Sequence, residues 1–433
     1  MKRSVATLMS LALTTAAQAQ LNEDEAAIVS WIDDQTSAIE ALVEDTVNIN
    51  SGTMNFEGVR EVGAVMRAEL NGLGFETEWI DLPRQTERAG HLFGRREGTH
   101  GRKLLLIGHL DTVFEPDDDF QTFIREGDWA TGPGAVDMKA GNVVIVYALK
   151  ALDEIGALDG TQIVVSYTGD EESVGSPLEI TRRDLIDAGQ WADVALGFEY
   201  GVRDEEAEWI TTARRSSSGW RLEVTGRQAH SSLVFSDDVG AGAIFEAARI
   251  LNVFYETVKG EQYLTFNAGA ILGGTDVDYD PTATRGEAFG KTNVVPRSAV
   301  VHGGIRTISE EQLERTREAM RAIVDAHLPH TEAEIFFTDR YPAMPPTDGN
   351  LQLHSMLSSI NEELGGETLP ALDPSRRGAA DISFVAPYVD ALGGLGGQGV
   401  NMHSPGERLD LTSLGPATKR AAILIYRLTR EGG

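Results

Sequence analysis

The stretch Leu104-Leu-Leu-Ile-Gly-His-Leu-Asp-Thr112 decides the fold of this chain. A short apolar run closed by Gly108 predicts a buried parallel strand, and His109 and Asp111 follow at its carboxyl end. Open α/β sheets bind ligands at that edge. Side chains alternate along an extended chain, so His109 and Asp111 point the same way and the carboxylate can fix the imidazole tautomer. This predicts a metal ligand; the alternative is a histidine that only stabilises the strand end.

The composition limits the class of protein before any motif is considered. The 433 residues, 41% of them apolar, are enough for two globular domains. The formal charge of −30 disfavours nucleic acid and anionic membrane surfaces as partners. The chain has no cysteine, which excludes disulfides and thiolate zinc sites. A metal site must therefore use histidine, aspartate and glutamate.

Residues 1–19 have the pattern of a signal peptide. Lys2 and Arg3 precede an apolar run, and Ala17-Gln18-Ala19 has the A-x-A form of a cleavage site. The alternative is an ordinary amphipathic first helix. No later stretch reaches the roughly 18 uninterrupted apolar residues that predict a membrane-spanning helix. We therefore expect a soluble, exported protein, either periplasmic or secreted, that does not enter the membrane.

The order of predicted elements indicates an α/β protein with a second domain inserted into the first. Strands and helices alternate before residue 212, which predicts a mostly parallel, doubly wound sheet with helices on both faces. The strands cover 75–82, 91–96, 103–108, 162–168 and 192–198. One or two helices cover 23–48, and the other helices of this domain cover 59–73, 134–153, 177–188, 351–364, 379–387 and 411–429. After residue 212 the order of predicted elements becomes β-α-β-β-α-β, which is the ferredoxin-like α+β unit, and the α/β pattern returns after residue 347. We expect a catalytic domain at 20–212 and 341–433, and an inserted lid or dimerisation domain at 213–340.

Further candidate metal ligands lie at predicted strand ends or in turns. They are Asp137 in Gly-Pro-Gly-Ala-Val-Asp, the pair Glu171-Glu172, Glu199 after a strand, and His403 in Asn-Met-His-Ser-Pro-Gly-Glu. Each of these alone is more often an ordinary surface residue. Together with His109 they lie where a parallel sheet gathers its ligands, and carboxylates with two imidazoles suit zinc, manganese or cobalt.

Three motifs extend this pattern: G-H-x-D-T-V at 108–113, G-P-G-x-x-D-M-K-x-G at 132–141 and D-E-E-x-x-G-S at 170–176. With them the chain resembles the co-catalytic zinc exopeptidases and amidohydrolases. That family includes aminoacylases, acetylornithine deacetylase, succinyl-diaminopimelate desuccinylase and bacterial glutamate carboxypeptidase, to which the likeness is greatest.

The resemblance implies a role for each candidate residue. Asp137 would bridge two zinc ions, for which cobalt or manganese could substitute. One ion would add His109 and Glu199, and the other Glu172 and His403. Glu171 would be the general base, and Asp111 would orient His109. The resemblance also implies a cis peptide bond after Asp137.

The inserted domain supplies a second set of residues through the same resemblance. His230, in Gly-Arg-Gln-Ala-His-Ser-Ser, matches a lid histidine that stabilises the oxyanion in the partner subunit, which implies a homodimer through the inserted domain. Asn293 and Arg306 match positions that contact the substrate, and Arg306 could bind a free α-carboxylate. Capping or surface roles are the alternatives for His230 and Arg306. Gly378 lies in a loop that matches the family's glycine-rich substrate loop only loosely.

Three functions remain open at this point. The first is a carboxypeptidase that releases a C-terminal amino acid from a small peptide. The second uses the same chemistry on N-acyl amino acids, as an aminoacylase does. The third is a non-catalytic relative that binds metal or peptide, which predicts a missing ligand or base, and the chain lacks neither.

Overall fold

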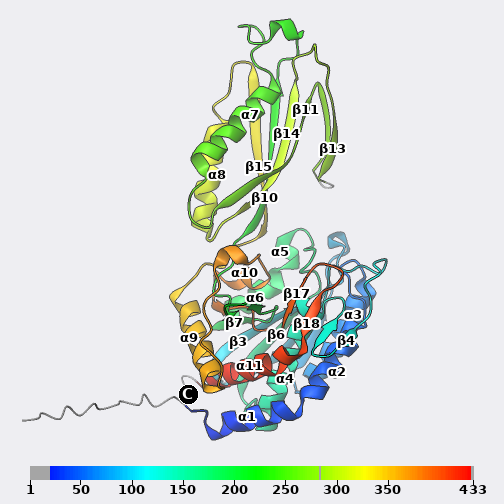
Figure 1. Cartoon of the computed structure of the whole chain (residues 1–433), viewed down its shortest axis with the longest axis vertical. Coiled ribbons are helices and arrows are strands. Elements are labelled where there is room, and N and C mark those ends of the chain that lie inside the picture. Colours follow the sequence, from blue (N-terminus) through cyan, green and yellow to red (C-terminus); the bar gives the residue numbers. More distant parts are fainter. Residues whose placement is uncertain (1–19, 282–283, 431–433) are drawn as a thin grey trace, which may run out of the picture.

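The computed structural model describes residues 20–281 and 284–430, so the signal peptide expected at 1–19 lies outside it. The chain forms two regions, each with its own sheet. The large-sheet domain consists of residues 20–216 and 342–430, and the lid domain, residues 217–341, lies above it in Figure 1. The predicted α/β class with an inserted α+β domain is confirmed.

The large sheet has six strands, and its central part is parallel. In spatial order the strands are β1 (Glu76–Ile80), β2 (His91–Arg96), β6 (Thr161–Thr168), β3 (His100–His109), β7 (Val194–Gly197) and β16 (Asp390–Leu392). The pairs β6–β3, β3–β7 and β7–β16 are parallel, whereas β1–β2 and β2–β6 are antiparallel. The strand predicted around residues 104–108 is therefore central, with its carboxyl end between those of β6 and β7.

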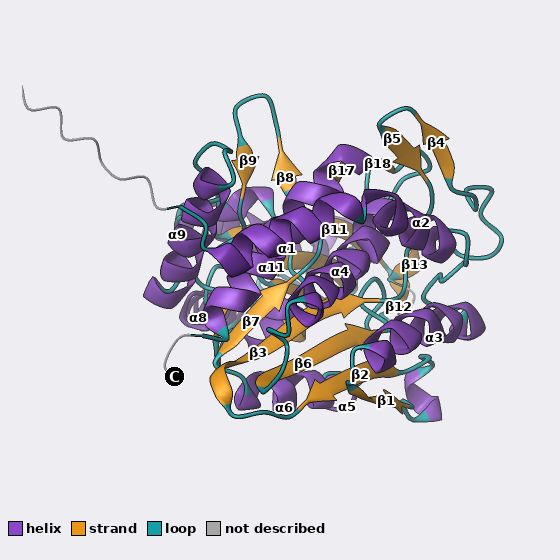
Figure 2. Ribbon diagram, turned by 90° about the horizontal axis from the view of Figure 1, so that it is seen from below, coloured by secondary structure: helices purple, strands orange, loops and turns teal. Residues whose placement is uncertain are grey.

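Successive residues of β3 pack against opposite helix layers. Leu104 and Leu106 belong to the larger hydrophobic cluster, whereas Leu105 and Ile107 belong to the cluster on the other face. This alternation is what strand geometry requires in a sheet that is covered on both sides. Figure 2 shows helices on either side of the strands. The first layer contains α1 (Glu23–Asp34), α2 (Thr36–Val47), α3 (Phe56–Gly72), α4 (Ala140–Glu154), α9 (Asp348–Glu363) and α11 (Leu414–Leu428).

The second helix layer differs from the prediction. The single helix expected at 177–188 is two helices, α5 (Leu178–Thr181) and α6 (Arg183–Trp191). The break falls at Arg182, whose fully buried guanidinium pairs with Asp170 and Asp381, so the residue turns into the interior. The helix expected at 379–387 is only the short α10 (Ile382–Val385).

The lid domain is a four-stranded antiparallel sheet with two helices. Its elements are β10 (Ser217–Gly226), α7 (Ala243–Val253), β11 (Thr265–Gly274), β14 (Ser298–Arg306), α8 (Glu310–Val324) and β15 (Thr331–Tyr341). The spatial order β11-β14-β10-β15 is that of the predicted ferredoxin-like unit. Residues of both helices and of the sheet, among them Trp220, Ile250 and Met320, form its separate core.

Several short strands were not predicted, because too few residues are present to show a period. A hairpin of β12 (Asp276–Asp280) and β13 (Arg285–Phe289) lies between β11 and β14 in the chain. A small sheet contains β17 (Gln398–Val400), β18 (Arg408–Asp410), β5 (Trp129–Thr131) and β4 (Ile124–Glu126), and β8 (Val202–Arg203) pairs with β9 (Glu208–Trp209). Among the residues that the structure describes, we find no helix with the length and apolar character needed to cross a membrane.

Candidate metal centre and active site

Four of the five predicted metal ligands meet at the carboxylate of Asp137. Its Oδ1 lies 3.3 Å from Nε2 of His109, and its Oδ2 lies 3.2 Å from Nε2 of His403. The same nitrogen of His403 lies 3.1 Å from Oε2 of Glu172. The ligand atoms of His109, Asp137 and Glu172 are all within 4.8 Å of one another. Residues from four separate segments of the chain therefore form one cluster.

The local backbone places Asp137 at the centre of this cluster. Gly134, in the left-handed region at φ 69°, precedes an irregular helical turn at Ala135–Lys139 that leads into α4. The Asp137–Met138 peptide bond is cis, as the resemblance implied. The N–H groups of Val136 and Asp137 both donate to Oε1 of the buried Glu407, at 2.7 and 3.1 Å. Glu407 follows His403 in the loop before β18, so it fixes the two ligand segments relative to each other.

Asp111 connects His109 to the acidic pair. Nδ1 of His109 lies 3.0 Å from the main-chain oxygen of Asp111 and 3.5 Å from its carboxylate Oδ1. The same carboxylate accepts the N–H groups of Glu171 at 3.0 Å and Glu172 at 3.1 Å. The hydroxyl of Thr53 donates to it at 2.7 Å. Asp111 therefore holds the loop that carries the acidic pair as well as the imidazole beside it.

The pKa values in the cluster reflect its concentration of charge. Burial opposes protonation of His109, but Asp111 and Asp137 outweigh it and raise the pKa of the imidazole well above its usual range. Hydrogen bonds with Asp137 and Glu172 raise the pKa of His403 to about 11. Burial and the Asp137 charge raise the pKa of Glu172 to about 7. Positive charge is thus strongly stabilised at this position, which is what a cation site requires.

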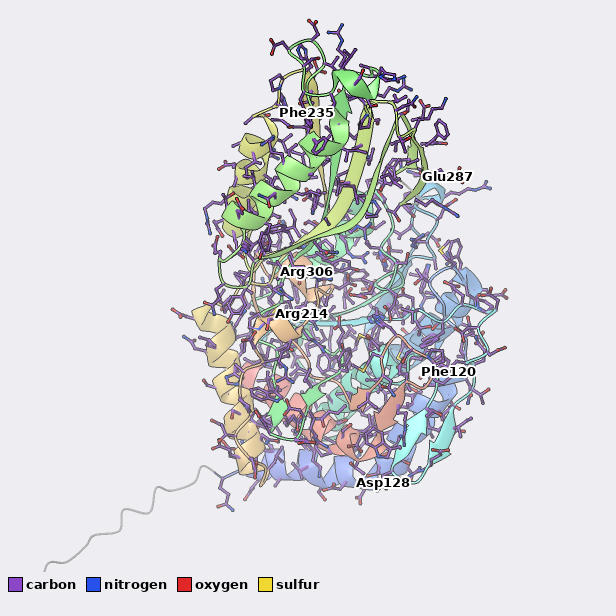
Figure 3. All side chains as sticks on the ribbon, turned by 45° about the horizontal axis from the view of Figure 1, so that its top comes forward. Phe120, Asp128, Arg214, Phe235, Glu287 and Arg306 are labelled. Atoms are coloured by element: carbon purple, nitrogen blue, oxygen red, sulfur yellow. The ribbon has the colours of Figure 1, made fainter. Side chains whose placement is uncertain are left out.

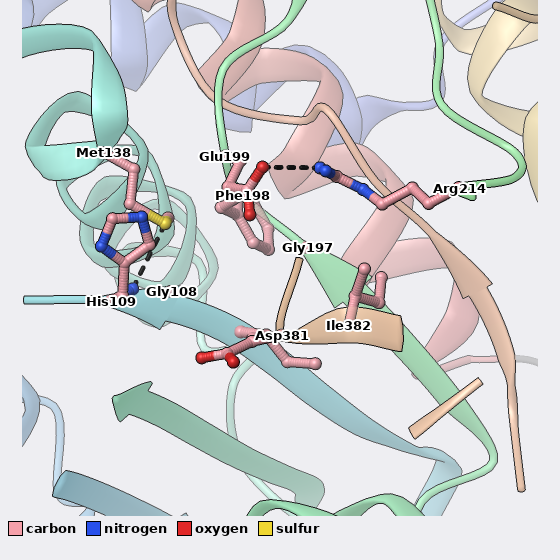
Figure 4. Close-up of a pocket in the computed structure, with 10 residues that line it drawn as sticks. Gly108, His109, Met138, Gly197, Phe198, Glu199, Arg214, Asp381 and Ile382 are labelled. Carbon is pink, nitrogen blue, oxygen red and sulfur yellow. Dashed lines mark hydrogen bonds and ion pairs between the residues drawn. The ribbon is translucent and has the colours of Figure 1, made fainter. Parts of the chain in front are cut away.

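Glu199 reaches the same region from the end of β7 but contacts arginines. It lines a cavity of about 10 Å³ together with His109 and Asp381 (Figure 4). Its Oε2 lies 2.6 Å from Arg214 and 3.4 Å from Arg377. The structure therefore brings the fifth predicted ligand to the cavity beside His109, with its carboxylate held in an ion pair.

Glu171 is next to Glu172 in the chain but is not one of the four clustered side chains. Its backbone is hydrogen-bonded at both ends, and its carboxyl group interacts electrostatically with His109. Burial and the Glu199 charge raise its pKa well above the usual range for a carboxylic acid. A carboxyl group whose pKa is raised by burial and a neighbouring charge is suited to accept and return a proton.

The remaining predicted residues lie in the lid and in one loop. His230 and Asn293 are exposed and close together, because the N–H of Ser231 donates to the oxygen of Asn293 at 2.9 Å and His230 pairs with Val294. Arg306 is exposed at the end of β14, and its charge acts on Arg215; Figure 3 labels it above Arg214. The oxygen of the exposed Gly378 accepts a hydrogen bond from Arg214 at 3.1 Å.

Sequence reasoning did not identify several residues of the site. Glu407 belongs to the segment quoted for His403, which was the only available signal for it. Thr53, Arg214 and Asn142, whose amide donates to the main-chain oxygen of His109 at 2.6 Å, come from segments without any motif. Only the fold shows that these residues contact the predicted ones.

The donor set fits divalent cations of the zinc, cobalt and manganese type. Two imidazole nitrogens and two carboxylates, with N···O distances of 3.1 to 3.3 Å, are hard and borderline ligands without sulfur. His109, Asp137, Glu172 and His403 are the residues that would hold the ions. A carboxyl group beside such a cluster is the arrangement that metal-dependent hydrolases use.

Comparison with known proteins gives the family. Residues 105–427 match the profile of Peptidase family M20/M25/M40, and the chain belongs to this family. Carboxypeptidase G2 of Pseudomonas sp. is 27% identical over 441 residues, which cover 99% of this chain and 98% of that protein. Succinyl-diaminopimelate desuccinylase of Gluconacetobacter diazotrophicus is 26% identical over 84% of this chain and 91% of its own length.

Solved structures support the same fold. Aminopeptidase PepT of Bacillus cereus has a TM-score of 0.71 at 18% identity, covering 91% of this chain and 98% of its own. YXEP of Bacillus subtilis, described as a dinuclear metal-binding peptidase of the M20 family, has a TM-score of 0.62 at 15% identity, with coverage of 91% and 98%. The chain is thus a hydrolase of a family that contains dinuclear metallopeptidases.

Proposed function

We propose that this protein is a di-zinc exopeptidase of the glutamate carboxypeptidase type, which releases a C-terminal amino acid from a small peptide. The observation that carries this proposal is the contact of one carboxylate, Asp137, with both His109 and His403. Asp137 would bridge the two zinc ions. Glu199 would complete the ligand set by exchanging its ion pair with Arg214 for a bond to zinc. The similarity to carboxypeptidase G2 over nearly the whole chain supports a peptide substrate.

The chemistry follows from the position of Glu171. Bound zinc ions would polarise the scissile carbonyl and acidify a water molecule. Glu171 accepts the proton of the attacking water as the new carbon–oxygen bond forms, and it then delivers this proton to the leaving nitrogen as the carbon–nitrogen bond breaks. The carboxylate of Asp111 accepts the N–H group of Glu171 and so keeps Glu171 in place.

Recognition of the substrate carboxylate is assigned to Arg306. Arg306 borders a groove of about 280 Å³ that is also lined by Thr265 and Asn267. Arg215 donates to the hydroxyl of Thr265 at 3.0 Å, and burial together with the charge of Arg306 lowers the pKa of Arg215. Two neighbouring guanidinium groups favour an anion, and a carboxylate matches their planar donors. Asn293 and Gly378 are proposed to contact the rest of the substrate.

We also propose a homodimer through the lid domain, in which His230 of each subunit stabilises the oxyanion in the other. His230 is exposed, as this role requires. Exposed apolar side chains near it support an interface: Phe235, labelled at the end of the lid in Figure 3, is 67% exposed, and Phe245 is 54% exposed with its ring 5.4 Å from that of Phe235. A monomeric mass with full activity would contradict this assembly.

A second candidate function is hydrolysis of N-acyl amino acids. The similarity to succinyl-diaminopimelate desuccinylases, whose name describes removal of an acyl group, favours this alternative. The cleaved bond is again an amide beside a residue with a free carboxylate, so the cluster and Glu171 keep the same roles.

The test is kcat/KM of the purified, zinc-loaded protein on matched dipeptides and N-acyl amino acids, with peptide amides as controls. Preference for dipeptides with a free C-terminal carboxylate supports the carboxypeptidase, and preference for N-acyl amino acids supports the alternative. A zinc-loaded protein that hydrolyses neither series would be a non-catalytic binder, contrary to the proposal. N-terminal sequencing of the protein recovered from the periplasm or medium tests export, for which cleavage after Ala19 is expected.

A further inference from the structure

The junction between the two domains makes a direct contact with the loop of the acidic pair. Tyr341 is the last residue of β15, and it pairs with Ser217, the first residue of β10. These two residues are where the chain enters and leaves the lid. The phenolic hydroxyl of Tyr341 donates a hydrogen bond to the main-chain oxygen of Glu171 at 2.6 Å. A residue of the lid sheet thus holds the peptide that carries the acidic side chain.

The same Glu171 residue is held from the opposite side. Its N–H donates to Oδ1 of Asp111 at 3.0 Å, at the end of the strand that supplies His109. The backbone of Glu171 therefore has one hydrogen bond to the large-sheet domain and one to the lid junction. Loss of either bond would leave the direction of the side chain less well defined, because its backbone dihedrals set where the carboxyl group points.

The ring of Tyr341 rests on a rigid support. It packs on Phe384 of α10, with the ring centroids 5.0 Å apart. The guanidinium of Arg182 lies over the ring of Phe384, 5.4 Å from its centroid. Ion pairs with Asp170 at 2.6 Å and Asp381 at 2.9 Å fix this guanidinium. Burial and the Glu171 charge raise the pKa of Tyr341 well above its usual range, so the hydroxyl keeps its proton and remains a donor.

We propose that Tyr341 is a positioning residue for Glu171, which holds the peptide of the general base at the junction of the two domains. The inference rests on the proposed function of Glu171, and it adds a residue that neither touches the substrate nor binds the metal. Because its ring is anchored on the large-sheet domain, Tyr341 keeps the base oriented at the point where the chain leaves the lid.

The test compares Tyr341→Phe with Tyr426→Phe in the zinc-loaded full-length protein. The control loses an equally short hydrogen bond, from Tyr426 to Asp24 at 2.6 Å, between α11 and α1. We expect Tyr341→Phe to lower kcat about tenfold while KM stays within about twofold of wild type, since one neutral hydrogen bond is lost away from the substrate. Metal content and the midpoint of unfolding should match those of the control variant.

A second measurement does not depend on activity. Hydrogen exchange followed by mass spectrometry should show faster exchange of amides in residues 169–175 in Tyr341→Phe, and no change there in Tyr426→Phe. Unchanged kcat with unchanged exchange, or a loss of kcat that accompanies metal loss or unfolding, would overturn the inference. A wild-type protein inactive on the whole amide panel would refute the proposed function instead, and the exchange result would still decide whether Tyr341 fixes this loop.

Discussion

The Nε2 atom of His403 lies 3.2 Å from Oδ2 of Asp137, although 266 positions separate the two residues in the chain. The other oxygen of Asp137 lies 3.3 Å from His109, at the end of the central strand β3. A single carboxylate therefore connects the strand that organises the large sheet with the loop between β17 and β18. Glu407 reinforces the connection through the backbone of Asp137. The following predictions depend on this arrangement.

Replacement of Glu171 by glutamine should abolish proton transfer without loss of metal. General acid–base groups contribute about 10²- to 10⁴-fold, so we expect kcat to fall by that range while zinc content stays at the wild-type value. The matched control is Glu179→Gln, an exposed carboxyl group on α5. Steady-state kinetics and elemental analysis provide the two readouts. Wild-type turnover in Glu171→Gln would remove this residue from the mechanism.

Zinc binding should release protons. Asp137 and Glu172 raise the pKa of His403 to about 11, so this imidazole is protonated in the metal-free protein at pH 7, and Asp111 and Asp137 shift the pKa of His109 in the same direction. A metal ion binds the deprotonated nitrogen, and affinity therefore weakens as the pH falls. Calorimetry in buffers of different ionisation enthalpy should detect release of the His403 proton, with the His109 imidazole adding to the total. Zinc binding to His403→Gln should release fewer protons than binding to wild type, and the control His354→Gln should release as many as wild type. Proton uptake, or no proton release, on zinc binding to wild type would contradict the assigned ligands.

Glu407 should make the metal-free protein less stable at high pH. Burial raises its pKa to about 8, from an ordinary value of 4.5. The folded state thus binds this proton more tightly than the unfolded chain, so the stabilisation is complete below about pH 4.5 and is lost as the pH rises through 8. Glu407→Gln should raise Tm relative to wild type more at pH 9 than at pH 5. The exposed Glu97→Gln is the control, and an equal difference at both pH values would disprove the assignment.

The buried Arg182 should be essential for stability. Its removal leaves Asp170 and Asp381 without their partner in the interior, and breaking a buried ion pair in this way costs about 3 to 5 kcal/mol. Arg182→Ala should therefore lower the free energy of unfolding by that amount. The neighbouring Arg183→Ala, whose side chain is 60% exposed, should change it by less than about 0.5 kcal/mol. Denaturant titration distinguishes the two, and equal effects would show that the buried cluster is not stabilising.

The sequence predicted the parts of the structure that repeat or that carry motifs. The apolar run from Leu104 to Ile107 predicted a buried parallel strand, and the β-α-β-β-α-β order predicted the lid. The motifs located His109, Asp137 and Glu172, which the structure brings together.

The remaining features depend on tertiary contacts that leave no pattern in the sequence. The ion pair of Glu199 with Arg214 and the bond from Tyr341 to Glu171 join segments whose proximity only the fold creates. The break at Arg182 depends on the position of Asp381, which lies on the other side of the lid insertion in the chain. Propensity and periodicity describe neighbours along the chain, so they cannot report these contacts.

The most direct test of the account is an anomalous difference map at the zinc absorption edge, from crystals of the zinc-loaded protein. We predict two peaks beside the carboxylate of Asp137, about 3.5 to 4 Å apart, one within bonding distance of His109 and the other within bonding distance of His403. A map without a peak in contact with Asp137 would contradict the claim that these side chains form a metal centre.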